Sequence, residues 1–491
     1  MRILFYNWVD HLDRQQRGGG VAVYQRNLIA ALTAVPGVQA AALTSGLAHD
    51  LRPGPPRWAP VATGPEREAA RGYEIVNSGL LAPGHSDYGS PAQLSHGPTE
   101  DVFADFLHRT GPWDVVHFNN LEGIPAAALA RAKQELGARV VLSLHNYYPF
   151  CPQVNLWHRE RENCTDFDAG RRCVSCLPVV PNRRVARAAL ALSSRFGRGG
   201  ALPGGQALGQ ALWVALRGAW RGYRRLRGAG RTGTPAAAPA PVQPERAAAF
   251  ANRRRQMVDL INRHCDAVLC VSDRVRQIAA HHGIAPGLLH TAYIGSREAR
   301  NWQTTTPAAR FLADDGTLHL AYLGYMRADK GFPFLLDALS ALPDATLARL
   351  RLTVAAQKGA ASMMTQMAAL APRLAGFRHL DGYSHDTLDQ VLDGVALGVV
   401  PVLWQDNLPQ VAIEMHARHI PVLASDLGGA QELGRCKALV FRAGDRADFA
   451  RALEGVLSGA VQPGDYWQGA MAPVTMNEHL ARLLPIWRGE G

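Results

Sequence analysis

Two carboxylates eight positions apart, Asp406 and Glu414, have the spacing in this chain that says most about chemistry. Pro409 stands where it can open a helix, which places Glu414 inside that helix among apolar residues and Asp406 in the loop before it. A buried carboxylate is costly unless it accepts hydrogen bonds, and ribose hydroxyls would donate them. The next apolar strand runs into Gly428 and Gly429 at another helix start. The pattern predicts a ligand site at one edge of a sheet.

Basic residues follow the apolar strand expected over 318–323. Arg327 and Lys330 precede Gly331, and a helical pattern begins directly after it. Cations at the positive end of a helix offset the charge of a diphosphate leaving group. Lys330 is also one of only four Lys among the 52 basic residues. The sequence predicts a diphosphate site here; the alternative is a loop of solvated charges.

Histidine ends two of the expected strands in the first half. His145 follows the strand 140–144, and His117 lies near the end of the strand 115–118. The carboxyl ends of parallel strands are where open α/β sheets bind ligands, and a His there can donate to an oxyanion or a sugar hydroxyl. For each His the alternative is a hydrogen-bonded structural role, which the sequence favours for His117.

A run of three glycines follows the first expected strand. Gly19 and Gly20 belong to this run, which opens a helical pattern. Bare backbone N–H groups at a helix start can cradle a phosphate or let a sugar approach closely. The run is not a G-x-G-x-x-G fingerprint, so a plain dinucleotide site is disfavoured. The alternative is a flexible loop.

Four cysteines fall within 26 residues: Cys151, Cys164, Cys173 and Cys176. Four thiolates could hold a tetrahedral Zn²⁺, although their spacing is irregular. Three interpretations stay open: a structural zinc ion, free thiols or disulfides. No open coordination position is evident, so we expect no metal or other cofactor in catalysis.

Apolar strands alternate with helical patterns along the chain, and several strands are apolar on both faces. They are expected at 3–6, 39–43, 115–118, 140–144 and 267–271, and then at 318–323, 352–355, 397–402, 421–424 and 438–441. Strands buried on both faces belong to parallel sheets covered by helices. The fold class is therefore α/β, with two Rossmann-like domains facing across a cleft. We expect domains at 1–300 and 314–464, with an amphipathic helix in 465–491 returning to the first domain.

Length and composition narrow the class of protein. With 491 residues and 47% hydrophobic residues the chain can build more than one core, which excludes wholesale disorder. No stretch approaches the roughly 18 apolar residues that span a bilayer. The N-terminus reads as a strand rather than a signal peptide, because acidic residues follow almost at once. We expect a cytoplasmic protein.

The net charge of +11 is concentrated in one insertion. Residues 178–244 contain eleven Arg and no Lys, Asp or Glu, so the rest of the chain sums to zero. This Gly-, Ala- and Pro-rich segment, 178–245, has a linker composition. Its middle, 210–228, is either a basic amphipathic helix for an anionic membrane surface or a disordered or locally helical insertion. Because the folded body is neutral, nucleic acid is not expected as a partner.

Taken together, these motifs resemble family 4 of the glycosyltransferases (group 1), which have the GT-B fold. The resemblance covers nearly the whole chain apart from the insertion. It implies a retaining enzyme of the hexosyltransferase type that transfers a sugar from a nucleotide-diphospho-sugar without a metal. The acceptor would be a glycan or a lipid-linked molecule in cell-envelope polysaccharide synthesis, at the inner face of the membrane.

The resemblance also implies roles for single residues. Glu414 would bind the donor ribose, and Asp406, with the backbone of Asn407 and Leu408, would hold the donor sugar. Arg327, Lys330, Gly428 and Gly429 would bind the diphosphate, Gly19 and Gly20 would approach a phosphate or sugar, and His145 would lie near the reacting centre.

This sequence departs from the family pattern at two of these motifs. The family's acidic pair usually begins with Glu where this chain has Asp406, and an Arg usually stands at the position of Tyr325. Two other functions therefore stay open: a GT-B protein that has lost turnover and binds a nucleotide or polyanion, and another GT-B enzyme such as an epimerase or phosphorylase.

Overall fold

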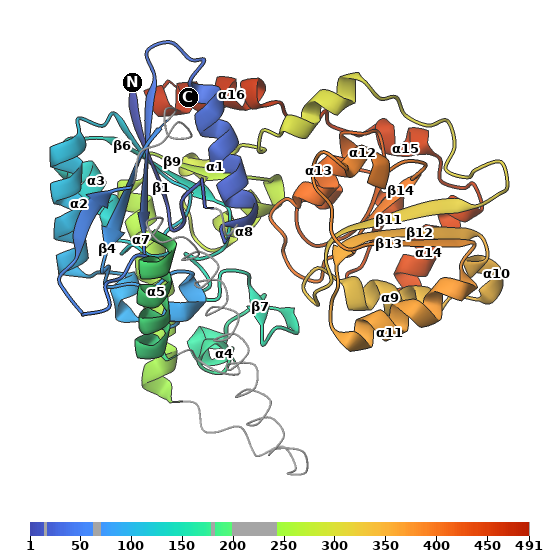
Figure 1. The fold of residues 1–491 in the computed structure, drawn as a ribbon, viewed down its shortest axis with the longest axis horizontal. Coiled ribbons are helices and arrows are strands. Elements are labelled where there is room, and N and C mark those ends of the chain that lie inside the picture. Colours follow the sequence, from blue (N-terminus) through green and yellow to red (C-terminus); the bar gives the residue numbers. More distant parts are fainter. Residues whose placement is uncertain (14–16, 62–69, 178–181, 199–242, 491) are drawn as a thin grey trace.

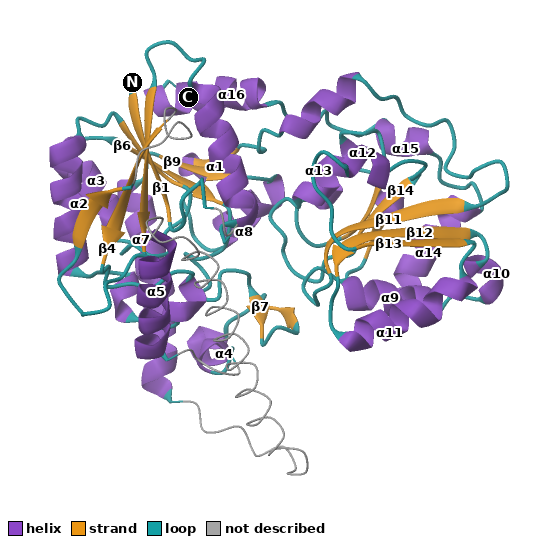
Figure 2. Cartoon of the chain, in the orientation of Figure 1, coloured by secondary structure: helices purple, strands orange, loops and turns teal. Residues whose placement is uncertain are grey.

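The computed structural model of the chain describes residues 1–13, 17–61, 70–177, 182–198 and 243–490. Two parallel β-sheets lie side by side, each with helices on both faces (Figures 1 and 2). Both chain ends lie in the N-terminal domain, so the chain crosses to the C-terminal domain and returns (Figure 1).

The N-terminal domain is built on an eight-stranded sheet. Its strand order is β10-β9-β6-β5-β1-β2-β4-β3, and all neighbours are parallel except β3 and β4. The strands are β1 (Arg2–Asn7), β2 (Gln39–Ser45), β3 (Arg57–Pro60), β4 (Ala70–Val76), β5 (Val115–Phe118), β6 (Arg139–Leu144), β9 (Ala267–Cys270) and β10 (Leu289–Thr291). Its helices are α1 (Gly19–Leu32), α2 (Gly97–Thr110), α3 (Ala128–Leu136), α4 (Arg171–Val174), α5 (Arg183–Arg198), α7 (Pro244–His264) and α8 (Asp273–His281). A small hairpin of β7 (Trp157–His158) and β8 (Glu162–Asn163) lies outside the sheet.

The C-terminal domain is built on a six-stranded, fully parallel sheet. Its order is β13-β12-β11-β14-β15-β16. The strands are β11 (Leu318–Tyr325), β12 (Leu350–Gln357), β13 (Gly376–Leu380), β14 (Leu397–Val400), β15 (Val422–Ser425) and β16 (Val440–Phe441). The helices are α9 (Phe332–Ser340), α10 (Asp344–Leu347), α11 (Ala361–Leu370), α12 (Leu388–Val391), α13 (Gln410–His416), α14 (Arg446–Leu457) and α15 (Pro463–Trp467).

Both sheets reverse their winding beside their first strand. In the N-terminal sheet β1 lies between β2 and β5, and in the C-terminal sheet β11 lies between β12 and β14. Such a switch point opens a crevice at the carboxyl ends of the strands, which is where doubly wound sheets bind ligands. The predicted pair of Rossmann-like domains is confirmed, and the fold fixes where each domain offers a site.

All ten predicted strands are present, whereas four strands of the two sheets were not predicted. β3, β4, β10 and β13 lie at or next to the edges of their sheets. β4 includes the charged residues Arg71 and Glu74, and β13 is only half-buried. Because an edge strand is covered on fewer sides than a central one, it lacks the apolar run by which a buried strand is recognised.

A last helix, α16 (Met476–Arg488), packs on the N-terminal domain. Thr475 and Glu478 form a capping box at its start. The Trp487 ring lies 5.9 Å from Phe5 of β1 and 5.8 Å from His117 of β5, measured between ring centroids. The C-terminus therefore completes the core of the first domain (Figure 1).

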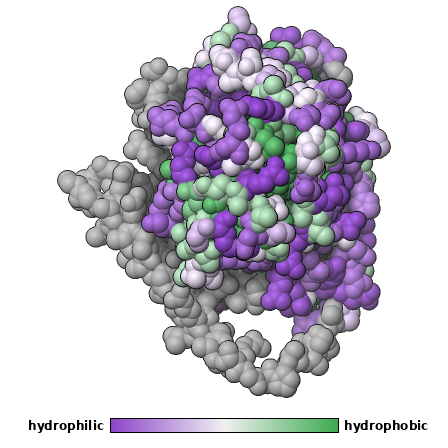
Figure 3. Space-filling model, turned by 90° about the vertical axis from the view of Figure 1, so that its right-hand side faces the viewer, coloured by the Kyte–Doolittle hydropathy of each residue, from purple (hydrophilic) through white to green (hydrophobic). Residues whose placement is uncertain are grey.

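The surface of the C-terminal domain that faces away from the N-terminal domain is mostly hydrophilic. Figure 3 shows this face, with apolar residues gathered near its middle. Within the described residues, no helix is long and apolar enough to cross a membrane.

The predicted insertion at 178–245 is described only at its two ends. Its first part forms α5, a helix that the composition did not predict, and its last residues join the start of α7. The candidate amphipathic helix at 210–228 lies outside the described residues.

Replacing Trp487 tests whether α16 holds the first domain together. Trp487→Ala removes a side chain that is 2% exposed, and we expect it to lower the free energy of unfolding by about 3–5 kcal/mol. The matched control is Arg488→Ala on the same helix, which should change it by less than about 0.5 kcal/mol. Denaturant unfolding followed by circular dichroism measures both, and equal midpoints for the two variants would contradict the interpretation.

Candidate active site

The ligand-binding edges of the two sheets meet at the junction between the domains. Asn407, in the loop after β14, donates from its side-chain amide to the backbone oxygen of Leu144 at the end of β6 (3.2 Å). The hydroxyl of Ser272 donates to the backbone oxygen of Asn407 (2.7 Å). Gln410, the first residue of α13, donates to the backbone oxygen of Gly20 (3.4 Å). The loops that the sequence singled out in both domains are therefore in contact.

Lys330 and Asp406 form an ion pair on the C-terminal side of this junction. The Lys330 Nζ lies 2.5 Å from an Asp406 carboxylate oxygen and 5.2 Å from the centre of the Trp404 ring. Asp406 is buried and Lys330 is half-buried. Two segments that are 76 positions apart thus place a cation and a carboxylate at one point, between the end of β11 and the loop after β14.

The glycine loop after β15 packs against the backbone of Asp406. Gly429 donates its backbone N–H to the backbone oxygen of Asp406 (3.0 Å). Gly428 has φ +76°, and a Cβ there would lie 2.1 Å from the same oxygen. The close approach and the positive φ explain why this position needs glycine. In this structure, both glycines hold the loop that carries Asp406.

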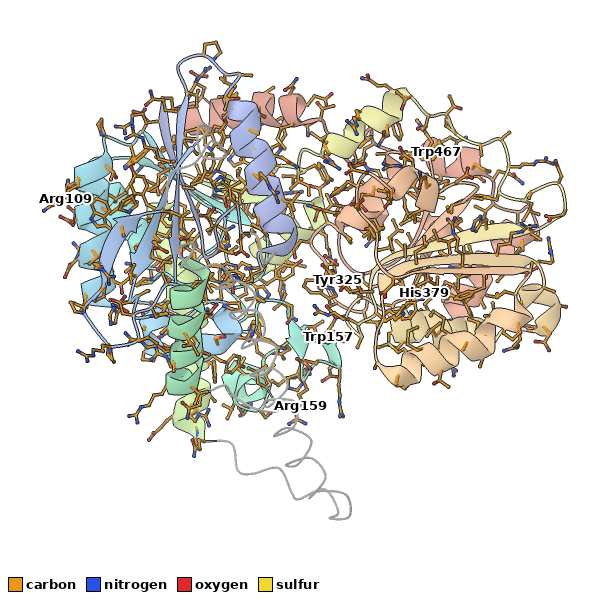
Figure 4. The ribbon with its side chains drawn as sticks, in the orientation of Figure 1. Arg109, Trp157, Arg159, Tyr325, His379 and Trp467 are labelled. Carbon is orange, nitrogen blue, oxygen red and sulfur yellow. The ribbon has the colours of Figure 1, made fainter. Side chains whose placement is uncertain are left out.

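Arg327 is held by its own loop. Its guanidinium donates two hydrogen bonds to the Asp329 carboxylate, at 2.9 and 2.8 Å. Tyr325, the last residue of β11, is 57% exposed and lies on the side of the C-terminal domain that faces the N-terminal domain (Figure 4). An arriving anion would therefore meet Lys330 inside the site and Arg327 nearer its rim.

Glu414 lies on α13 in a buried polar cluster. Tyr383 donates its hydroxyl to Glu414 Oε2 (2.9 Å), while the His385 ring lies 3.8 Å from Oε1. The neighbouring Glu298 pairs with Arg418 (2.8 Å). Burial raises the pKa of Glu414, and the hydrogen bond from Tyr383 opposes this shift. Oε1 is left as an acceptor for a ligand hydroxyl.

His145 directly follows β6, next to Leu144, whose backbone oxygen accepts from Asn407. Its ring packs 4.8 Å from that of Tyr24, and its buried Nε2 has no hydrogen-bond partner among the described residues. Burial and the nearby His479 lower the pKa of His145 to about 3. The imidazole is therefore neutral near pH 7 and can exchange a hydrogen bond with a ligand.

The glycine run begins α1 and reaches the other domain. Gly19 has φ +51° and is the first residue of the helix. A Cβ on Gly20 would lie 3.2 Å from the side-chain nitrogen of Gln410. The run thus lets the start of α1 come close to the start of α13, beside the ion pair.

His117 has a structural position. It is fully buried beside Trp487, and its Nε2 bonds to the Ser143 hydroxyl (2.8 Å). Burial lowers its pKa to about 3. Of the two interpretations that the sequence left open, the structure supports the structural one.

Glu122 is a site residue that the sequence reasoning missed. It follows β5 at the switch point, is buried, and accepts hydrogen bonds from the backbone of Gly84 (2.5 Å) and the side chain of Asn146 (2.7 Å). Burial raises its pKa to about 7. The side chain of Asn119, also buried at the end of β5, has no partner among the residues described. The signal was present, because Asn119, Asn120 and Glu122 directly follow the apolar strand 115–118.

The four clustered cysteines are free thiols that lie near one another. Cys151, Cys173 and Cys176 are buried, and the Cys176 thiol donates to Gln153 (2.9 Å). Burial, together with the neighbouring thiols, raises the pKa of Cys164 to about 12. In the part of the chain that the structure describes, no group of three or more His, Cys, Asp or Glu is arranged to hold a metal ion. All seven cysteines are free thiols, and the structural zinc stays a prediction.

The C-terminal domain matches a known family of proteins. Residues 317–459 match the family model described as glycosyl transferases group 1. Comparison with curated protein sequences gives no match.

Solved structures match over the whole length of the chain. HepE of Anabaena in complex with UDP is 12% identical, with a TM-score of 0.56 and full coverage of both chains. WaaB, a lipopolysaccharide outer core galactosyltransferase in its apo form, is 11% identical with the same TM-score and coverage. A UDP-forming α,α-trehalose-phosphate synthase from Burkholderia xenovorans is 14% identical, with a TM-score of 0.55, covering 99% of this chain and 98% of the other. At these identities the likeness shows the fold, and it confirms the predicted GT-B arrangement.

The raised pKa of Glu122 predicts a pH dependence of stability. The unfolded state releases this proton near pH 4.5 and the folded state near pH 7, so between these values the folded state binds more protons and stability falls as pH rises. The loss should approach about 3 kcal/mol for a shift of this size. Urea unfolding from pH 4.5 to 7.5 should show it in the wild type and not in Glu122→Gln. The surface variant Glu454→Gln should keep the wild-type slope, and equal slopes in all three proteins would refute the assignment.

Proposed function

We propose that this chain, which carries a group 1 glycosyltransferase domain on a GT-B fold, is a retaining enzyme of the hexosyltransferase type. It transfers a sugar from a nucleotide-diphospho-sugar to a glycan or lipid-linked acceptor. The observation that carries the proposal is the Lys330–Asp406 pair at the C-terminal switch point, which adjoins the hydrogen bond between Asn407 and Leu144 across the domain junction.

The C-terminal domain offers groups for each part of such a donor. The Lys330 ammonium would offset charge on the diphosphate as the leaving group departs, and Arg327 would add a second cation from the rim. Glu414 Oε1 would accept from a ribose hydroxyl, because Tyr383 already occupies Oε2. Gly428 and Gly429 keep the loop close enough to the diphosphate for backbone contact.

The donor sugar would lie between the domains. Asp406, with the backbone N–H groups of Asn407 and Leu408, would bind its hydroxyls. A neutral His145 would hydrogen-bond the sugar near the reacting carbon from the opposite side. With a pKa of about 3, His145 is not a proton donor at neutral pH, so its role is to orient and stabilise.

Retention would follow from attack on the face that the leaving group vacates. In this proposal a phosphate oxygen of the donor takes the proton of the acceptor hydroxyl, and no protein nucleophile or catalytic metal takes part. Lys330 beside that phosphate would stabilise the developing charge.

The proposed setting is cell-envelope polysaccharide synthesis at the cytoplasmic face of a membrane. The support is the eleven Arg of residues 178–244, which would attract the protein to an anionic surface. HepE was solved with UDP, and the synthase is UDP-forming, so we propose a UDP-sugar as the donor.

Nucleotide binding tests the donor site. UDP should raise the thermal stability of the purified wild type more than GDP, ADP, CDP or dTDP does, by about 2.7 kcal/mol at a hundred times its dissociation constant. Lys330→Ala should lose most of this stabilisation, because the diphosphate loses the half-buried cation that offsets its charge. The control is Lys437→Ala, at an exposed position of the same domain, which should respond like the wild type. If no nucleotide stabilises the wild type, the protein has lost its donor site and a polyanion-binding function takes precedence.

Two further variants separate binding from chemistry. Glu414→Ala should weaken UDP binding by about tenfold, the effect of about 1.4 kcal/mol. His145→Ala should bind UDP normally but lower the rate at which a UDP-sugar is hydrolysed by at least about tenfold. Calorimetry measures the first effect and UDP release the second. Unchanged UDP affinity in Glu414→Ala would disprove the ribose role, and unchanged hydrolysis in His145→Ala would remove His145 from the reacting centre.

A further inference from the structure

A basic hollow lies away from the donor site, where β4 ends and α5 begins. It has a volume of about 440 Å³, and its lining includes Asn77 and Ser78 after β4, His96, and Arg183, Arg184 and Arg187 of α5. Figure 1 shows α5 beside the end of β4. No acidic side chain lines this hollow, which we call the arginine pocket.

Part of this positive charge is free to meet a ligand. Arg183 pairs with the buried carboxylate of Asp87 and donates to the backbone oxygen of Gly79 (2.6 Å). Arg187 only donates to the amide oxygen of Asn77, at 3.4 Å. Arg184 is exposed, and the described residues give it no side-chain partner. Arg183 is therefore held by its partners, whereas the side chains of Arg184 and Arg187 can turn toward an anion.

The charges of the pocket reach a neighbouring imidazole. Burial lowers the pKa of His49 to about 4, the charges of Arg187 and Arg183 add to this shift, and Asp50 opposes it.

The arginine pocket opens on the same sheet edge as the reacting centre. β4 runs parallel to β2, and β2 runs parallel to β1, so Ser78 follows its strand at the edge where the switch point lies. The Ser78 hydroxyl donates to the backbone oxygen of Gly123 (3.0 Å). Gly123 adjoins Glu122, which bonds to Asn146 beside His145. A polar path therefore leads from the pocket to the acceptor side of the candidate active site.

Two exposed hydrophobic residues adjoin, in the sequence, a residue of the pocket or the partner of one. Leu51 and Val185 are 52% and 58% exposed, and they are two of the three large hydrophobic residues that are exposed in the described part of the chain. Val185 lies between Arg184 and Arg187 in sequence, and Leu51 adjoins Asp50, which accepts from the Asn77 side chain (2.7 Å). Cations beside exposed aliphatic groups suit a phosphate that is attached to an apolar chain.

We propose that the arginine pocket binds the phosphate or diphosphate group of the acceptor substrate. Arg184 and Arg187 form charge-assisted hydrogen bonds to it, Asn77 and Ser78 line the base, and the acceptor sugar extends along the sheet edge toward Glu122 and His145. This inference rests on the proposed function for the identity of the reaction, but the anion site can be tested without it.

Inorganic pyrophosphate is the first probe, measured by calorimetry on the full chain. The measurements use Lys330→Ala, so that the proposed donor site does not compete. We expect pyrophosphate to bind the Lys330→Ala variant. Adding both Arg184→Gln and Arg187→Gln to that variant should weaken the binding at least tenfold. The control is Lys330→Ala with Arg246→Gln added. Arg246 is exposed in the first turn of α7, so this variant should bind pyrophosphate as tightly as Lys330→Ala alone. Circular dichroism verifies folding of each variant.

Two further probes distinguish the source of the phosphate. One is a soluble sugar 1-phosphate, and the other is a neutral phosphatidylcholine vesicle with a few per cent of a polyprenyl phosphate. Binding of the vesicle above the level of pure phosphatidylcholine, lost in the double Arg variant, assigns the pocket to a lipid-linked acceptor. Binding of the sugar phosphate alone, with the same loss, assigns it to a soluble acceptor.

The proposal is overturned if pyrophosphate does not bind Lys330→Ala, or if it binds the double Arg variant equally well. Failure of the proposed function has a different signature. In that case UDP does not stabilise the wild type, whereas pyrophosphate still binds in an Arg184- and Arg187-dependent manner.

Discussion

The contact of Asn407 with the N-terminal domain is the interaction on which the candidate site depends. Its side chain donates to the backbone of Leu144, and its backbone oxygen accepts from Ser272. Because Leu144 precedes His145 and Asn407 follows Asp406, the same contact places the two predicted site residues on opposite walls of one space. The hydrogen bonds of Glu432 to the backbone of Asp273 and Arg274 join the two domains at the same junction.

The two walls differ in electrostatics, and the difference suits a reaction with an anionic leaving group. The C-terminal wall has the Lys330 ammonium, which is neutralised by Asp406 in this structure and can be shared with a diphosphate. The N-terminal wall is polar, with His145 kept neutral by burial and Glu122 held at the edge of ionisation. Further positive charge lies at Arg274, which donates to Gln405 at the junction, and at the arginine pocket. A substrate that crosses this surface would therefore meet cations at both ends and neutral donors and acceptors between them.

The sequence predicted the central strands well because each of them is apolar on both faces, as in Val140–Leu144. It missed β4 and β13, whose charged and half-buried residues reflect their places at or near the sheet edges. It singled out His145, Lys330, Asp406 and Glu414 because they interrupt or follow apolar patterns. Glu122 also follows an apolar strand, β5, but the sequence analysis selected His117 on that strand and did not select Glu122.

The sequence alone determined the fold class and the loops that carry chemistry, because burial of strands and helices leaves a periodic record in the residues themselves. Only the tertiary structure decided which of those loops meet. Lys330 and Asp406 are 76 positions apart, and Asn407 and Leu144 are 263 apart; a pairing across such a distance depends on strand order, which no local pattern encodes. The same holds for the four clustered cysteines, whose thiols come near one another only in the folded chain. Charge and hydrophobicity are properties of residues, whereas a site is a property of the distances between them.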